Sequence, residues 1–333
     1  MNKQKQNLHQ LVDSFAKKKI AVWGDFILDE YVFGNTHRIS REAPVLILSY
    51  KTKEFSLGGA GNSVLNLKAL GAEPLPVGVI GSDDSGQKIL QLLEKKGITS
   101  EYMVKEKKYH TPIKTRILAG EENTRKQQIL RIDREGNVPE SSGLKQKIQR
   151  HLENVRKQIS ALLVSDYNYF TVKEDIFNRI LPAFKKIDTP VTLDSRFRLL
   201  NFKGITVSTP NEPEVEGALG IEIGDNAQVL KQAGRLLLKK TGAIAMLITR
   251  GSRGMALFEK NKTPFFIPIR GTTDIVDVTG AGDTVISVIT LALACGATFR
   301  EAAQLSNYAG DISVMKKGTA TLSTQELKEA IRA

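Results

Sequence analysis

A run of small residues between two carboxylates, at 277–284, has the composition of a phosphoryl-transfer site. It reads Asp277-Val-Thr-Gly-Ala-Gly-Asp-Thr284 and precedes an apolar stretch typical of a buried helix. Its three small residues allow a tight turn that points backbone N–H groups at one anion, at a helix N-terminus that favours phosphate. Asp283 beside it could accept the proton of an attacking hydroxyl. The alternative is an acidic N-cap, but the second carboxylate and the small residues favour the anion site.

A second glycine turn also opens a helix and could bind a polyol. It reads Leu57-Gly-Gly-Ala-Gly-Asn-Ser63. Backbone at Gly58 and Gly59 can approach a ligand closely, and Asn62 offers both a donor and an acceptor to a pair of hydroxyls. The third glycine of a dinucleotide-binding turn is missing, and the sequence has no Walker-type loop. Alone, such a turn is often only a packing device.

An acidic segment, Gly24-Asp-Phe-Ile-Leu-Asp29, follows the first expected strand. Ligands of open α/β sheets bind beyond the carboxyl ends of the strands. Asp25 and Asp29 could therefore accept hydrogen bonds from a polyol. The alternative is an ordinary acidic loop.

Two more segments follow expected strands and suit a nucleotide with its metal. In Thr209-Pro-Asn-Glu-Pro-Glu214, Asn211 and Glu214 could hold hydrated Mg²⁺ near phosphates. In Thr249-Arg-Gly-Ser-Arg-Gly254, the two glycines permit close approach to a polyphosphate. Each segment alone is more often a turn, but together they favour a nucleotide site.

The elements that position these segments alternate between short β-branched runs and longer helical patterns. This alternation is typical of βαβ units around a mainly parallel sheet. We expect strands at 20–24, 76–80, 161–165, 191–194, 205–208 and 243–249, an antiparallel strand at 255–259 near a sheet edge, and helices at 62–70, 86–96 and 283–295, the last capped by Gly296.

Two stretches, Tyr31 to Lys53 and Thr111 to Arg134, interrupt this rhythm with β-ribbon patterns. A small sheet inserted between core elements often serves as a lid or a dimer surface. The alternative is that these ribbons are edge strands of the main sheet. Because no Pro/Gly/Ser linker separates two units, we expect a single domain over residues 1–333, with lid segments at about 31–53 and 111–134.

Composition limits the classes of protein. The 333 residues, 41% hydrophobic and 25% charged, can bury a full core without staples. The single cysteine, Cys295, excludes a disulfide framework, and neither a targeting signal nor a membrane-length apolar run is present. We therefore expect a cytoplasmic protein. Its net charge of +12 attracts anions, but no nucleic-acid-binding motif accompanies it, so we expect no nucleic-acid or membrane partner.

The segments in this order resemble the ribokinase-like (PfkB) carbohydrate kinases. Gly58-Gly59…Asn62 and Asp277-x-Thr-Gly-Ala-Gly-Asp283 are similar to the two family signatures, and the resemblance extends from about Lys18 to Ser323. It implies an α/β fold with a doubly wound, mainly parallel sheet flanked by helices, and a small inserted β lid over the sugar. It also implies ATP-dependent phosphorylation of a sugar hydroxyl.

The resemblance further implies roles for individual residues. Asp283 would be the general base, with the backbone of Gly280, Ala281 and Gly282 as anion hole. The other implied roles are sugar binding by Asp29, Gly58, Gly59 and Asn62, ATP binding by Asn211, Glu214, Thr249, Gly251 and Gly254, Mg²⁺ binding through water by Asn211 and Glu214, and a monovalent cation such as K⁺ at Asp277 and Thr279.

Three segments resemble one subfamily more closely. Gly24-Asp-Phe-Ile-Leu-Asp-Glu-Tyr31, Arg38-Ile-Ser-Arg-Glu-Ala-Pro-Val45 and Ser165-Asp-Tyr167 are similar to D-glycero-D-manno-heptose 7-phosphate kinases. These phosphorylate the anomeric hydroxyl to give the 1,7-bisphosphate during synthesis of ADP-heptose, a lipopolysaccharide precursor. Arg41 stands where that subfamily usually has proline, and Asn168-Tyr-Phe170 replaces a stretch with glycine and lysine. Lid-side cations that could meet the substrate phosphate are Arg38, Arg41, Arg116 and Arg131.

Several alternatives remain open. The acceptor could be fructose, ribose, a nucleoside or fructose 6-phosphate. A non-catalytic sugar or nucleotide sensor on the same scaffold is also conceivable, although it would have no need of Asp283. We further expect a homodimer formed through the β lid.

Overall fold

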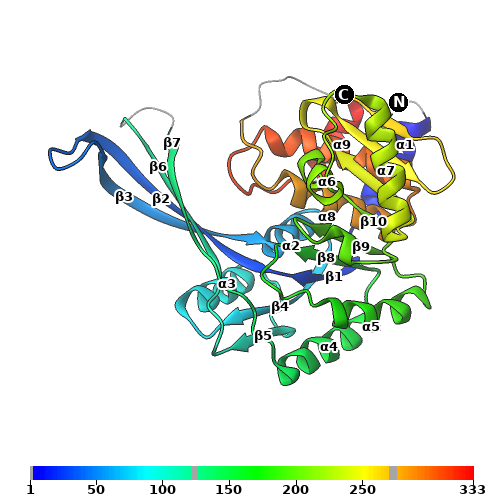
Figure 1. Ribbon diagram of the computed structural model, residues 1–333, viewed down its shortest axis with the longest axis horizontal. Helices are drawn as coiled ribbons and strands as arrows, with labels where there is room; N and C mark the ends of the chain where they lie inside the picture. The colour runs from blue at the N-terminus through cyan, green and yellow to red at the C-terminus, as the bar shows by residue number, and fades with distance from the viewer. Residues whose placement is uncertain (1–2, 122–125, 270–275) are drawn as a thin grey trace.

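A nine-stranded sheet forms the body of the molecule. The computed structural model describes residues 3–121, 126–269 and 276–333, and its strand order is β13-β12-β11-β10-β9-β8-β1-β4-β5 (Figure 1). Pairing from β5 through β11 is parallel, whereas β12 and β13 are antiparallel at one edge. The strands are β1 (Lys19–Gly24), β4 (Glu73–Gly81), β5 (Met103–Glu106), β8 (Ala161–Asp166), β9 (Val191–Ser195), β10 (Val207–Ser208), β11 (Ala245–Thr249), β12 (Met255–Glu259) and β13 (Phe265–Ile267).

Helices cover both faces of this sheet, because alternate residues of each strand point to opposite sides. In β1, Ile20 and Val22 join one hydrophobic core, while Ala21 and Trp23 join the other. The first core holds α1 (Lys3–Asp13), α2 (Ala60–Ala69), α3 (Asp84–Lys95), α8 (Ala281–Ala294), α9 (Phe299–Val314) and α10 (Thr324–Arg332), and the second holds α4 (Ser142–Arg156), α5 (Glu174–Lys185), α6 (Glu212–Leu219) and α7 (Ala227–Thr241).

This arrangement confirms the doubly wound, mainly parallel α/β fold. The antiparallel strand expected at 255–259 is β12, and the buried helix expected at 283–295 is α8, followed by Gly296 with a φ of 83°. The short edge strands β5 and β13 were not predicted, since three or four residues carry too little periodicity.

A second sheet of four strands, here called the small sheet, projects from the body as an arm (Figure 1). Its order is β3-β2-β6-β7, with the central β2–β6 pair parallel and the outer pairs antiparallel. The strands are β2 (Phe26–Ile39), β3 (Leu46–Gly59), β6 (Ile113–Gly120) and β7 (Gln127–Arg134). The two expected β-ribbons therefore pair with each other, and the alternative of edge strands in the main sheet is wrong.

The small sheet is longer than the sequence pattern indicated. β2 begins at Phe26, directly after the first strand of the body, and β3 runs to Gly59. Asp29 therefore lies on a strand rather than in an acidic loop, in register with Ser56 and one position from the pair Leu28–Leu57. Residues 122–125 of the expected lid lie outside the described part of the chain. None of the described helices is long and apolar enough to cross a membrane.

Candidate active site

A cavity of about 1340 Å³ lies between the small sheet and the carboxyl ends of the body's strands. This is where open α/β sheets bind their ligands. A neighbouring cavity of about 730 Å³ is lined by Asp277 together with Thr279. The predicted residues that line the larger cavity are Asp29, Gly59, Arg116, Arg131, Asn211, Glu214, Thr249, Gly251, Gly254, Thr279, Gly280, Ala281, Gly282 and Asp283.

Asp283 lies in the first turn of α8 and is only 4% exposed. Its Oδ2 accepts a hydrogen bond from Asn62 Nδ2 at 2.8 Å, and its Oδ1 accepts one from the Tyr167 hydroxyl at 2.9 Å. Burial raises the pKa of Asp283 to about 6, although both hydrogen bonds oppose the shift. The carboxylate is thus ionised at neutral pH and has a pKa suited to a general base. The acidic N-cap alternative is wrong, since Gly280 is the N-cap residue and has no side chain to bond.

The loop after β8 carries Tyr167, and Asp25 holds that loop in place. The Asp25 carboxylate is fully buried and accepts backbone N–H groups from Tyr167 at 2.8 Å, Tyr169 at 3.0 Å and Thr171 at 3.0 Å. This differs from the predicted polyol contact. Asp25 stands behind the cavity wall and positions the backbone from which Tyr167 reaches the base.

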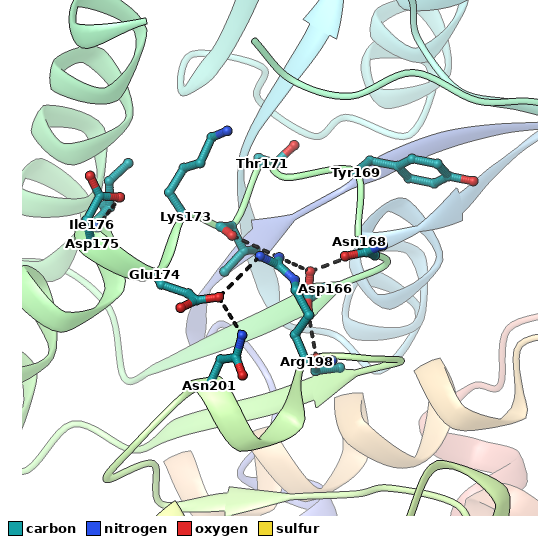
Figure 2. A network of polar contacts seen from close by, with 12 residues as sticks. Asp166, Asn168, Tyr169, Thr171, Lys173, Glu174, Asp175, Ile176, Arg198 and Asn201 are labelled. Atoms are coloured by element: carbon teal, nitrogen blue, oxygen red, sulfur yellow. Dashed lines mark hydrogen bonds and ion pairs between the residues drawn. The ribbon is translucent and has the colours of Figure 1, made fainter. Parts of the chain in front are cut away.

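A buried ion pair fixes the same loop from its other side (Figure 2). Arg198 pairs with the Asp166 carboxylate, which also accepts the Asn168 N–H at 3.2 Å. Asn168 and Phe170 have φ values of 67° and 65°, a left-handed conformation that is costly for an aromatic residue. The Arg198 guanidinium lies 4.8 Å from the centroid of the Phe170 ring. The strained loop is therefore held by contacts on both sides.

Asp29 faces the cavity from the small sheet and is 2% exposed. Its Oδ1 accepts a hydrogen bond from Arg116 Nη1 at 2.6 Å. Burial raises the pKa of Asp29, although the Arg116 cation opposes the shift. A Cβ built on Gly58 would lie 2.5 Å from Asp29 Oδ2. Glycine at position 58 therefore makes room for this carboxylate, rather than for a ligand as the sequence suggested.

The turn before α8 packs against Asn62. Gly280 has a φ of 78°, and a Cβ there would lie 2.5 Å from Asn62 Nδ2. Asn62 is fully buried, so it orients Asp283 instead of facing the cavity. The N–H of Ala281 donates to Val278 O at 3.2 Å. Of the three residues predicted as anion hole, Ala281 thus has its N–H engaged, while Gly282 lies in the first helical turn, where N–H groups lack partners within the helix.

On the body side of the cavity, Asn211 and Glu214 form the capping box of α6. Asn211 Oδ1 accepts the Glu214 N–H at 2.8 Å, and Glu214 Oε2 accepts the Asn211 N–H at 2.9 Å. Asp194, at the end of β9, lines the cavity beside them. Burial, followed by the charge of Glu214, raises the pKa of Asp194 well above its usual range. Two carboxylates in this position would be stabilised by a cation.

The turn at 249–254 follows β11, and its two glycines differ in role. Gly251 has a φ of 54° with open space around it, so its backbone is accessible from the cavity. A Cβ on Gly254 would lie 2.1 Å from Ile267 O, so glycine is required there for packing. Arg250 and Arg253 both pair with the buried Glu212, which fixes the turn against α6.

Asp277 organises the loop before the anion turn. Its Oδ1 accepts the Thr279 N–H and its Oδ2 accepts the Gly318 N–H, both at 2.9 Å. Partial burial alone would raise the pKa of Asp277, but these hydrogen bonds lower it overall. Within the described ranges, no three His, Cys, Asp or Glu side chains gather in a metal-binding cluster.

A comparison with family models shows to which family the chain belongs. Residues 17–326 match the model described as pfkB family carbohydrate kinase. The chain belongs to this family. It is therefore an ATP-dependent carbohydrate kinase. The buried carboxylate of Asp283 and the glycine turn beside it line the large cavity of this kinase.

Curated relatives of this kinase match nearly all of its length. It is 37% identical to the bifunctional protein HldE of Desulfatibacillum aliphaticivorans over 98% of this chain and 66% of the relative. It is 36% identical to HldE of Geobacter metallireducens over 97% and 65%, and 37% identical to HldE of Haemophilus influenzae over 96% and 64%. The chain thus spans slightly less than two thirds of these relatives.

Solved structures share the fold of this kinase. Arabidopsis thaliana ribokinase, complexed with ribose and ATP, aligns with a TM-score of 0.70 at 21% identity, covering 96% of this chain and 99% of that one. Escherichia coli phosphofructokinase-2, in complex with potassium, aligns with a TM-score of 0.74 at 18% identity, covering 95% and 98%. At these identities the likeness concerns the fold alone.

Several residues that line the cavity of this kinase received no site role from the sequence. Lys114, Tyr167, Asp194 and Arg196 are among them. Asp194 ends an expected strand and Tyr167 follows one, so their place at a carboxyl strand end was a usable signal. Arg196 follows the expected strand 191–194 and carried the same signal. Lys114 gave none, because its burial depends on how the small sheet lies over the body.

Proposed function

We propose that this kinase transfers the γ-phosphoryl group of ATP to the anomeric hydroxyl of D-glycero-D-manno-heptose 7-phosphate. The observation that carries phosphoryl transfer is Asp283, buried and hydrogen-bonded at both oxygens beside the glycine turn of α8. The heptose assignment is supported by the three segments that resemble heptose 7-phosphate kinases, and by 34–38% identity to HldE proteins over nearly the whole chain.

In the proposed reaction, the acceptor hydroxyl lies beside Asp283. Its oxygen forms a bond to the γ-phosphorus, the bond from that phosphorus to the β–γ bridging oxygen breaks, and ADP leaves. The hydroxyl proton passes to the Asp283 carboxylate. Gly280 and Gly282 direct backbone towards the transferred group at the positive end of the α8 dipole. Asp29, held by Arg116, accepts a hydrogen bond from the sugar.

The nucleotide is proposed to lie along the body side, against Thr249, Gly251 and Gly254. Mg²⁺ is the divalent ion that this site fits, because Asp194 and Glu214 are neighbouring carboxylates whose pKa values are raised by burial. Asn211 and Glu214 would hold the ion through water. Bound there, it would neutralise phosphate charge. A monovalent cation such as K⁺ is proposed for the loop of Asp277 and Thr279.

The small sheet is proposed to act both as a lid and as a dimer surface. It covers the cavity with Asp29, Lys114 and Arg116. Large apolar side chains are exposed on its strands and on the turn between them, which favours a self-complementary contact between two copies; they include Ile39, Val45, Tyr50 and Ile132. We place the enzyme in the cytoplasm, with neither a nucleic acid nor a membrane as partner.

An assay of ADP release across a panel of acceptors tests this function. The panel holds D-glycero-D-manno-heptose 7-phosphate, fructose 6-phosphate, fructose, ribose and a nucleoside. We expect the heptose phosphate to give the highest kcat/KM, with the product phosphorylated at the anomeric position. If the enzyme phosphorylates ribose or fructose but not the heptose phosphate, the proposed acceptor is wrong. Absence of acceptor-dependent ADP release across the panel would favour a sensor.

A further inference from the structure

Lys114 is a buried cation without a counter-ion. It lies on β6 of the small sheet, is 8% exposed and lines the cavity. No hydrogen bond or ion pair joins its ammonium to any residue in the described part of the chain; its polar contact is the face of the Tyr167 ring, 5.7 Å from the centroid. Burial, and next the charge of Arg196, lower the pKa of Lys114. A charged group is rarely left so unless a ligand completes it.

The nearby carboxylates are already occupied by arginines. Lys114 is in register with Asp29 on β2 and with Asp133 on β7. Asp29 binds Arg116 at 2.6 Å, and Asp133 binds Arg131 at 2.9 Å. Arg116 and Arg131 stand directly opposite each other across β6 and β7, a pairing of like charges that normally destabilises a sheet.

Arg196 adds a further cation from the body side of the cavity. It follows β9, lines the cavity and lies 5.2 Å from the centroid of the Tyr167 ring. Lys114 on the small sheet and Arg196 in the segment after β9 therefore contact the same aromatic ring. The hydroxyl of that ring donates to Asp283 at 2.9 Å. The unpaired cation of Lys114 thus lies one tyrosine side chain away from the proposed base.

We infer that Lys114 and Arg196 form the binding site for a phosphate group already carried by the acceptor sugar. This inference rests on the proposed function, because it assumes that an acceptor lies at Asp283. Lys114 shares its strand and cavity face with Arg116, the partner of Asp29, which assigns it to the acceptor rather than to ATP. Two of the cations suggested by sequence, Arg38 and Arg41, are exposed on the far part of the small sheet.

Equilibrium binding by titration calorimetry, without ATP, tests the site. The protein variants are wild type, Lys114→Met and Lys53→Met, the last a control on β3 that is ion-paired with Glu30. The ligands are two matched pairs: heptose 7-phosphate with heptose, and fructose 6-phosphate with fructose. We expect the Lys114→Met substitution to weaken binding of the phosphorylated sugar roughly 10- to 100-fold, the effect of losing one charge-assisted hydrogen bond. The unphosphorylated sugar should bind both variants alike, and Lys53→Met should match wild type.

Thermal stability and ATP affinity complete the test. Because Lys114 has no counter-ion, Lys114→Met should unfold at the same temperature as wild type or higher. The inference would be wrong if Lys114→Met bound every phosphorylated sugar as tightly as the wild type does. It would also be wrong if the variant lost affinity for ATP alone. If Lys114→Met weakens binding of fructose 6-phosphate but not of heptose 7-phosphate, the phosphate site is supported and the proposed heptose substrate is wrong. Preference of the wild type for unphosphorylated sugars would overturn both.

Discussion

Two neighbouring parts of the cavity, the base end at Asp283 and the region of Lys114, satisfy their charges in opposite ways. At the base end, Asp283 has both carboxylate oxygens hydrogen-bonded, and Asp25 behind it accepts three backbone N–H groups. On the other side of the Tyr167 ring, Lys114 is buried without an ion pair in any described segment. The chain itself completes the groups that must keep one geometry during the reaction, and leaves to the substrate the group that recognises it.

This difference has an energetic logic. Donors and acceptors fixed before the reaction stabilise developing charge without reorganising, so a preorganised base end serves catalysis. An unpaired buried cation destabilises the free protein but strengthens binding of an anion that can reach it. Changes at the base end should therefore slow every acceptor, whereas changes around Lys114 should alter which acceptor is used.

The largest effect should come from Asp283→Asn. Removing a general base typically slows turnover by roughly 100- to 10,000-fold, and the loss should be the same for all acceptors. ATP affinity should stay within about twofold of the wild-type value, because the proposed partner of Asp283 is the acceptor hydroxyl and not the nucleotide. Steady-state ADP release and nucleotide titration measure the two quantities. Asp188→Asn, at an exposed position whose left-handed φ of 50° suits asparagine, is the control. Unchanged turnover in Asp283→Asn would show that Asp283 is not the general base.

Asp25→Ala should be the variant that loses most stability. Its three backbone donors would be left buried without an acceptor, at about 1–3 kcal/mol each. The urea midpoint should fall clearly, and turnover should fall with it, because Tyr167 loses its support. The exposed Glu94→Ala on α3 is the matched control. A midpoint equal to that of the control would mean that Asp25 is free to bind a ligand, as the sequence suggested.

A smaller effect is expected from Tyr167→Phe, which removes one hydrogen bond from Asp283 and keeps the ring beneath the cations. The loss of about 1–1.5 kcal/mol should lower kcat roughly 5- to 10-fold. Tyr169→Phe, two residues along the same loop, is the control. If both variants lose the same activity, the hydroxyl of Tyr167 does not act on the base.

The pH profile gives the smallest and most specific signal. Only the ionised Asp283 can take a proton, so kcat/KM should fall as pH drops through the pKa of about 6 that burial produces. The Tyr167 hydrogen bond lowers that pKa, so its removal in Tyr167→Phe should shift the acid limb to higher pH. If the acid limb of the kcat/KM profile stays in place in Tyr167→Phe, or moves to lower pH, the hydrogen bond from Tyr167 does not stabilise the ionised Asp283.

The sequence predicted the framework better than the contacts inside it. Periodicity located the parallel strands other than β5, together with the buried helix α8, and glycine-rich turns located both walls of the cavity. It could not show that Gly58 accommodates Asp29 or that Asn62 faces Asp283, because these pairs join segments far apart in the chain. Lys114 looked like any strand lysine, since its burial depends on packing between two sheets.

The most direct test of the different roles of Asp283 and Lys114 compares two acceptors in variants of each residue. The measurement is kcat/KM for heptose 7-phosphate and for unphosphorylated heptose, in wild type, Lys114→Met and Asp283→Asn. We predict that Asp283→Asn lowers both values by the same factor, while Lys114→Met lowers the value for the phosphorylated sugar alone. Equal losses for both sugars in Lys114→Met would contradict the account, because Lys114 would then serve the reaction and not the recognition of the acceptor.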